Sequence, residues 1–79
     1  MAQTEMDKKM EQIGRQMYEA LLASEIAIKS GDETGYNYRI GILTGLINAV
    51  NVMDGYGLGH KMYDTAMSQI RFLKANGGI

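Results

Sequence analysis

The stretch with the clearest chemical potential is residues 54–61, DGYGLGHK, where three glycines alternate with other residues ahead of the chain's only histidine. Glycines let backbone N–H groups turn toward one object, and a helix that begins directly after them adds a partial positive charge. His60 and Lys61 would add further positive charge, and Tyr56 could stack on a base. The stretch therefore allows a small phosphate-bearing ligand of the nucleotide type to bind. Its candidate ligand-binding residues are Tyr56, Gly57, Gly59, His60 and Lys61.

The same stretch has a simpler interpretation as a joint between two helices. Its glycine spacing matches neither the dinucleotide-binding fingerprint nor the P-loop, and no strand precedes it. Gly55 would end one helix, and Leu58 would cover the joint. Gly57 and Gly59 would permit a sharp reversal of the chain. The sequence favours this interpretation, because the conformational freedom of glycine accounts for all three glycines.

The residue types that catalysis needs are scarce. Cysteine is absent, and no serine stands in the sequence context of a nucleophile elbow. The acid nearest to His60 on the same helix face is Asp64, four residues on, and this pair could orient the imidazole or simply lie on the surface. The acidic residues show no spacing that matches the carboxylate and histidine pairs of helical di-metal sites. We therefore expect a protein that is not an enzyme and that carries no metal or other cofactor.

A second cluster, GYNYRIG, spans residues 35–41 and combines aromatic and basic side chains. On a helix, Tyr36 and Tyr38 lie on different faces, whereas Tyr36 and Arg39 are three residues apart and can be neighbours. Tyrosine and arginine are enriched where protein partners bind, because both bury a large area and still make directional contacts. Tyr36, Tyr38 and Arg39 are therefore candidate partner-binding residues.

Hydrophobic periodicity predicts the elements that position these residues. Apolar residues recur at three- and four-residue steps in three segments, which is typical of helices. Gly31 can close the first helix in the left-handed conformation, and Asp32 or Thr34 can cap the second. Ser30 with Glu33 also has the spacing of a capping box. Proline is absent, and strand-like alternation is nearly absent. We expect one all-α domain over residues 1–79, a three-helix antiparallel hairpin or bundle with helices at roughly 4–30, 33–53 and 59–75.

The second of these helices is the least polar. Ile40 to Met53 form an uncharged run, and the apolar positions cover more than half of the helix circumference. Gly41, Gly45 and Ala49 form a ridge of small residues at four-residue spacing, where another backbone can come close. This ridge indicates either ordinary packing, within the chain or in a dimer, or room for a ligand. A helix of this kind needs partners on two sides.

Chain length limits how much surface a single copy can bury. Seventy-nine residues form a marginal core, and the absence of cysteine removes disulfides and thiolate metal sites as supports. Self-association is the remaining usual remedy. We therefore expect that homo-oligomerisation completes the fold.

Charge and hydropathy argue against several classes of function. Eight Lys and Arg against nine Asp and Glu give no broad attraction to phosphate backbones or anionic lipid, so we expect no general nucleic-acid binding. The longest uncharged run falls short of the about twenty residues that a membrane span needs, so we expect no membrane association. The N-terminus shows no export signal, and the absence of cysteine fits a cytoplasmic protein.

Two functional hypotheses follow. The first is a small non-enzymatic helical protein, a regulator or inhibitor, that binds a protein partner through an exposed helix face. The second is an oligomeric protein that sequesters a small phosphate-bearing ligand of the nucleotide type, at the Gly-rich loop or in a pocket between subunits. Only the second predicts that a nucleotide raises the melting temperature of the free protein.

Overall fold

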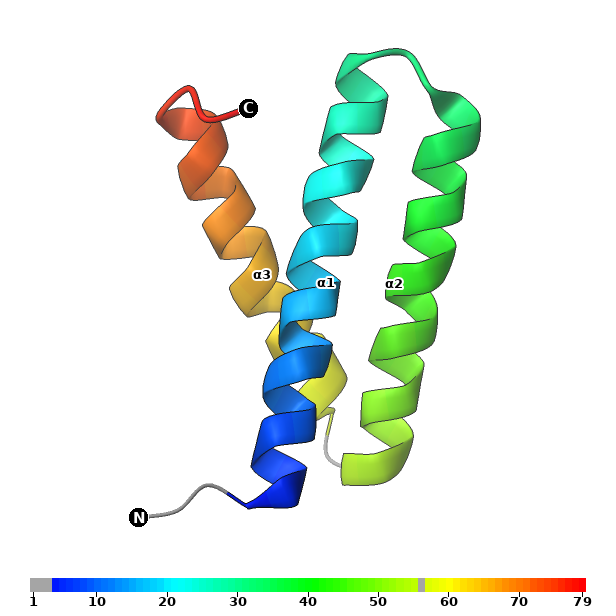
Figure 1. The fold of residues 1–79 in the computed structure, drawn as a ribbon, viewed down its shortest axis with the longest axis vertical. Helices are drawn as coiled ribbons and strands as arrows, with labels where there is room; N and C mark the ends of the chain where they lie inside the picture. Colours follow the sequence, from blue (N-terminus) through cyan, green and yellow to red (C-terminus); the bar gives the residue numbers. More distant parts are fainter. Residues whose placement is uncertain (1–3, 56) are drawn as a thin grey trace.

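The chain folds into three helices, and the computed structural model describes residues 4–55 and 57–79. The helices are α1 (Glu5–Lys29), α2 (Glu33–Asp54) and α3 (Leu58–Ala75). Figure 1 shows α1 and α2 as an antiparallel hairpin, with α3 crossing α1 obliquely and diverging from α2 toward its C-terminal end. Each helix contacts the other two, and the described residues contain no strand. The all-α, three-helix prediction is confirmed, and the observed helix ends lie within one residue of the expected positions.

Capping interactions close the turn between α1 and α2. Gly31 follows the end of α1 with a φ of 76°. The backbone N–H of Asp32 donates to the carbonyl oxygen of Ala27 at 2.8 Å, which satisfies an acceptor in the last turn of α1. The Asp32 side chain then accepts from the backbone N–H of Gly35 at 2.9 Å and caps α2. Of the capping residues that the sequence offers, the structure uses Asp32 rather than Thr34 or Ser30.

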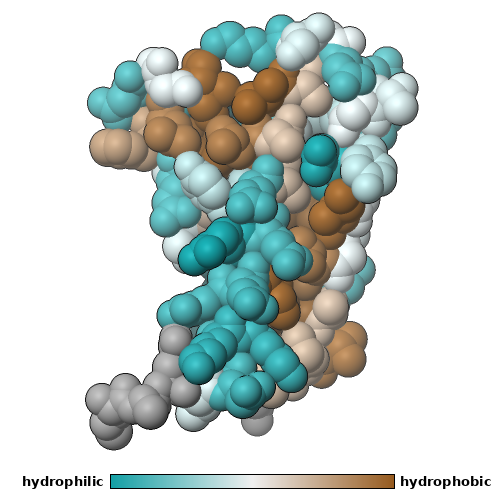
Figure 2. Space-filling model, viewed as in Figure 1, coloured by the Kyte–Doolittle hydropathy of each residue, from teal (hydrophilic) through white to brown (hydrophobic). Residues whose placement is uncertain are grey.

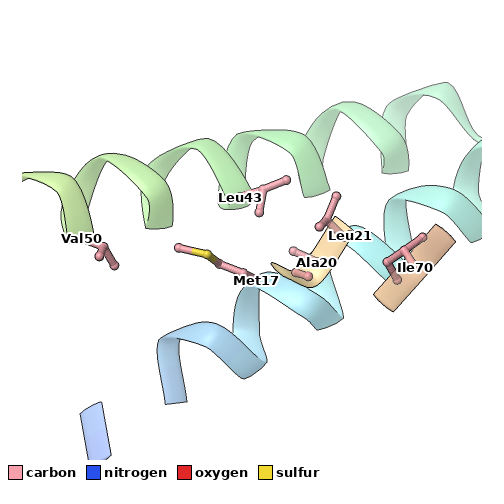
Figure 3. Packing of buried hydrophobic residues seen from close by; sticks show 7 residues of the cluster. Met17, Ala20, Leu21, Leu43, Val50 and Ile70 are labelled. Carbon is pink, nitrogen blue, oxygen red and sulfur yellow. The ribbon is translucent and has the colours of Figure 1, made fainter. Parts of the chain in front are cut away.

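The core lies where the three helices meet. Figure 3 shows Met17 of α1 pointing between α1 and α2, with Leu43 and Val50 on the facing side of α2. Ile70 comes from α3 and lies beside Leu21 of α1. Eight hydrophobic residues are buried among the described ones, and three of these are alanines. Thirteen partly buried hydrophobic residues of the described chain pack against this core, so much of the contact between the helices lies at its margin.

The surface has distinct hydrophilic and hydrophobic parts. Figure 2 shows hydrophilic residues over the N-terminal half of α1 and hydrophobic residues gathered where α1 and α3 end. At that end, Leu22 and Ile26 line a hollow of about 360 Å³ together with the C-terminal Ile79. An ion pair of 2.9 Å joins Lys74 of α3 to Glu25 of α1. Within residues 4–55 and 57–79, no helix combines the length and hydropathy that crossing a membrane requires.

Removing the Asp32 cap should weaken the folded state. Asp32→Ala deletes the acceptor for the Gly35 N–H and should lower the free energy of unfolding by about 1 kcal/mol. Thr34→Ala is the matched control, because Thr34 is exposed in the first turn of α2 and alanine is the better helix former. Urea denaturation followed by circular dichroism measures both variants. Equal losses would contradict the assignment of Asp32 as the cap.

Candidate functional site

The Gly-rich stretch forms the connection between α2 and α3. α2 ends at Asp54, and Gly55 follows with a φ of 76° and donates its N–H to the Asn51 carbonyl oxygen at 2.8 Å. Gly57, directly ahead of α3, has a φ of 78°. Both values lie in the left-handed region, which glycine adopts without steric cost, so these two residues make the reversal. Tyr56, one of the candidate ligand-binding residues, lies outside the described residues.

The backbone N–H groups at the start of α3 have acceptors within the chain. The Leu58 N–H donates to Asp54 Oδ2 at 3.2 Å, and the Gly59 N–H donates to Asn51 Oδ1 at 2.8 Å. The next two N–H groups bond to the Gly57 carbonyl oxygen, at 3.1 and 3.3 Å. An uncapped helix start offers free N–H groups to an anion. At the start of α3 an anion would first have to displace the Asp54 carboxylate or the Asn51 amide from these N–H groups. This geometry favours a joint over an anion cradle.

His60 and Lys61 are both exposed, and the imidazole of His60 pairs with Asn51. His60 Nδ1 lies 2.9 Å from Asn51 Nδ2. Because Oδ1 of the same amide accepts from Gly59, Nδ2 is the donor and His60 Nδ1 the acceptor, which leaves the ring proton on Nε2. The partner of the imidazole is therefore Asn51 rather than Asp64. One amide holds both the backbone and a side chain at the start of α3.

Gly59 is buried because α3 begins in close contact with α2. A Cβ at this position would overlap the carbonyl oxygen of Ile47 and would lie 2.7 Å from Asn51 Oδ1. The Ile47 contact is with backbone, which cannot rotate away as a side chain can. The φ of Gly59 is not in the left-handed region, so space rather than conformation requires glycine here. The alternating glycines therefore have two roles, conformational freedom at Gly55 and Gly57 and close approach at Gly59.

The structure separates the three candidate partner-binding residues. Tyr38 is 64% exposed, and the guanidinium carbon of Arg39 lies 5.5 Å from the centre of its ring, within the range of a cation–π contact. Tyr38 and Arg39 also line a hollow of about 340 Å³, whereas Tyr36 is half-buried and lines another, of about 310 Å³. Asp32 lines both hollows, so the two adjoin. The α1–α2 turn and the α2–α3 connection lie at opposite ends of the molecule, so neither hollow adjoins His60 (Figure 1).

An apolar groove runs between α1 and α3. Two hollows, of about 400 and 540 Å³, share Tyr18 of α1 and Gln69 of α3 as lining residues. Phe72, the chain's only phenylalanine, stands at the second hollow and is 69% exposed. The two helices cross obliquely (Figure 1). The other lining residues of the groove are Gly14, Arg15, Met62, Thr65 and Ala66 in the first hollow, and Ser68 and Leu73 in the second.

Two residues at these sites, Asn51 and Phe72, are absent from the sequence candidates. Phe72 falls outside the apolar stripe of the third helix, which is a signal that its ring has no place in the core. Asn51 carries a weaker signal, as one of few polar residues in an uncharged run. Asn51 can cap α3 only because it lies opposite the start of that helix. The spacing of residues along α2 does not show which residue lies opposite α3.

No protein-family model matches the sequence, and comparisons with curated proteins and solved structures find no match either. In the part of the chain that the structure describes, no three histidine, aspartate or glutamate residues come together as a metal site would need.

Gly59→Ala should destabilise the protein, whereas the same substitution at Gly14 should not. The new methyl group at residue 59 would overlap the Ile47 carbonyl oxygen, and overpacking of this kind costs about 1–3 kcal/mol. At Gly14 the nearest atom to a new Cβ is the terminal methyl of Met62, at 3.4 Å, so alanine should instead stabilise α1 by up to about 1 kcal/mol. Urea denaturation measures both variants. A Gly59→Ala variant as stable as the wild type would contradict the close contact of α2 and α3.

Variants of Asn51 should separate its two hydrogen bonds. Asn51→Ala removes both and should lower the free energy of unfolding by about 1–2 kcal/mol. Asn51→Asp keeps an acceptor for the Gly59 N–H and places a carboxylate at a helix N-terminus, so it should retain most of the stability. His60→Ala removes an exposed ring and one hydrogen bond, and should cost at most about 1 kcal/mol. If Asn51→Asp lost as much stability as Asn51→Ala in the same denaturation series, the assigned cap on Gly59 would be wrong.

Proposed function

We propose that this protein is a small non-enzymatic regulator or inhibitor that binds an apolar segment of a protein partner through the exposed face of α3 and the groove beside it. The position of Phe72 is the observation that carries the proposal. Its ring is 69% exposed beside a hollow that Tyr18 and Leu73 help to line. Burying a large apolar side chain of this kind gains about 1.5–3 kcal/mol. A surface that keeps the ring exposed is suited to being covered by a partner.

The residue types in the groove support a protein partner. Tyr, Phe, Met and Arg are enriched in protein interfaces, and the groove contains Tyr18, Phe72, Met62 and Arg15. Methionine adapts its shape to an irregular partner surface. The polar groups along the groove are neutral side chains such as Gln69, apart from Arg15. They can orient a bound segment without requiring a charged one.

The length of the groove suits a helix. Its lining residues on α3 extend from Met62 to Leu73, which corresponds to about 17 Å at the rise of an α-helix. An amphipathic partner helix of three to four turns would lie along such a groove with side chains at positions i, i+3, i+4 and i+7 as anchors. Phe72 and Tyr18 would contact these anchors from the two sides.

We also propose that the protein works as a homo-oligomer. The buried residues of the described chain include only five hydrophobic side chains larger than alanine, which is a small core for 79 residues. Large hydrophobic side chains remain exposed on α2, where Val52 is 84% and Met53 is 53% exposed. Association between copies would bury such side chains and supplement the core. A monomer in sedimentation at micromolar concentration would overturn the homo-oligomer.

Affinity capture with matched surface variants tests the docking face. Phe72→Asp places a charge beside the groove and should remove the partner, because aromatic anchors in interfaces commonly contribute about 2 kcal/mol or more. Met6→Asp is the control, since Met6 is an exposed hydrophobic residue of α1 that lines neither hollow of the groove. Both positions are on the surface, so both variants should keep the helical circular dichroism spectrum of the wild type.

Quantitative mass spectrometry of proteins captured from the cells that make this protein gives the result. A protein retained by the wild type and by Met6→Asp, but lost from Phe72→Asp, is the expected outcome. Identical captures by the wild type and Phe72→Asp would overturn the proposed docking face. A partner lost from Met6→Asp alone would do the same, because it would place docking on the N-terminal part of α1.

A further inference from the structure

The turn that ends α3 contains the chain's only asparagine that is followed by glycine, Asn76 before Gly77. Asparagine is among the chemically labile residues of proteins. Its side-chain carbonyl carbon can form a five-membered ring with the next backbone nitrogen, although a side chain on that next residue hinders the approach. Gly77 has no side chain, so its nitrogen is open to the Asn76 side chain. The other asparagines precede larger residues within α2 and are Asn37, Asn48 and Asn51.

The reaction open to this pair is deamidation through a cyclic imide. The Gly77 backbone nitrogen loses its proton and forms a bond to the side-chain carbonyl carbon Cγ of Asn76. The bond from Cγ to Nδ2 breaks, and the Nδ2 nitrogen leaves as ammonia. Water then opens the ring at one of its two carbonyl carbons, which leaves aspartate or isoaspartate at position 76. One water is consumed and one ammonia is released, so the reaction needs no enzyme, oxidant or cofactor.

Two hydrogen bonds of the folded turn oppose ring closure. Nδ2 of Asn76 donates to the Phe72 carbonyl oxygen at 2.8 Å, which holds the side chain against the end of α3. The Gly77 N–H donates to the Lys74 carbonyl oxygen at 3.3 Å, so the attacking nitrogen is itself engaged. The ring can therefore close only when the Asn76 side chain leaves the Phe72 carbonyl and the Gly77 N–H is released. Both changes require the last turn of α3 to open.

The turn from Lys74 to Gly78 is exposed and therefore easily opened. All five of its residues are exposed, so opening uncovers little apolar surface. The hydrogen bond from the Gly77 N–H is longer than the usual range for backbone bonds. The ion pair of Lys74 with Glu25 lies at the surface and adds little stability. The other three asparagines lie inside a helix of 22 residues, whose interior opens far less often than a helix end.

We propose that Asn76 is a site of spontaneous deamidation, and that the opening of the last turn of α3 controls the rate of the reaction. Asn76 combines the two conditions for the reaction, a following glycine and a position at a helix end that opens. The asparagines of α2 meet neither condition and should persist. The proposal depends neither on the docking face nor on self-association.

The product of the reaction should weaken the turn that protected the asparagine. A carboxylate at position 76 cannot donate a hydrogen bond to the Phe72 carbonyl oxygen. It also adds a negative charge at the negative end of the helix dipole. Isoaspartate in addition carries the main chain through the former side chain, which adds one carbon to the backbone after α3. The modified protein therefore keeps this turn open for more of the time than the unmodified one.

Mass spectrometry of the full chain measures the reaction at each asparagine. After incubation in mildly alkaline buffer, which favours loss of the Gly77 proton, the protein is digested at weakly acidic pH. The mass of each peptide shows whether an amide has been exchanged for a carboxyl group. The exchange should accumulate at Asn76 several-fold faster than at any asparagine of α2. Asn76→Gln is the matched control and should lose the signal, because the longer side chain has to close a six-membered ring.

Denaturation tests the role of the turn. In guanidinium chloride the turn is open in every molecule, so Asn76 should react several-fold faster than in the native chain at the same pH. Two variants test the effect of the product. Asn76→Ala removes the hydrogen bond to Phe72, and Asn76→Asp also adds the charge, so the melting temperature should fall from the wild type to Asn76→Ala to Asn76→Asp. Salt should narrow the difference between the two variants, because it screens the added charge.

Each measurement has an outcome that contradicts its part of the proposal. A reaction at Asn76 no faster than in α2 overturns the site. Equal rates in the native and the denatured chain overturn the control by the turn. A melting temperature of Asn76→Asp equal to that of the wild type overturns the effect of the product. Capture through Phe72 and sedimentation of the protein are independent of all three results.

Discussion

The contact between the start of α3 and the last turns of α2 sets the geometry of the rest of the molecule. At Gly59 the two helices are so close that a methyl group would overlap the Ile47 carbonyl oxygen. Asn51 adds hydrogen bonds to Gly59 and His60 at the same point. The direction of α3 is therefore fixed at its first turn. From there α3 crosses α1 obliquely (Figure 1), and the groove beside Phe72 lies between these two helices.

A second constraint is that few large side chains are fully buried, whereas thirteen described hydrophobic residues pack on the core while only partly buried. α1 and α3 pack on the same side of α2, so α2 buries only Leu43 and Val50 although it is the least charged of the three helices. Composition and burial thus disagree for α2 within a single chain. Val52 and Met53 remain exposed on this helix, and this exposure is the basis of the homo-oligomer proposed above.

Local signals account for the features that the sequence predicts well. Helix number and ends depend on apolar periodicity and on caps such as Asp32, which involve residues a few positions apart. The role of Gly59 could not be predicted in this way, because a close approach is a property of two segments and their relative register. Sequence alone gives Gly57 and Gly59 the same role, whereas the structure gives them different ones. Asn51 is missed for the same reason, and Tyr36 is grouped with Tyr38 because they are close in sequence although they line separate hollows.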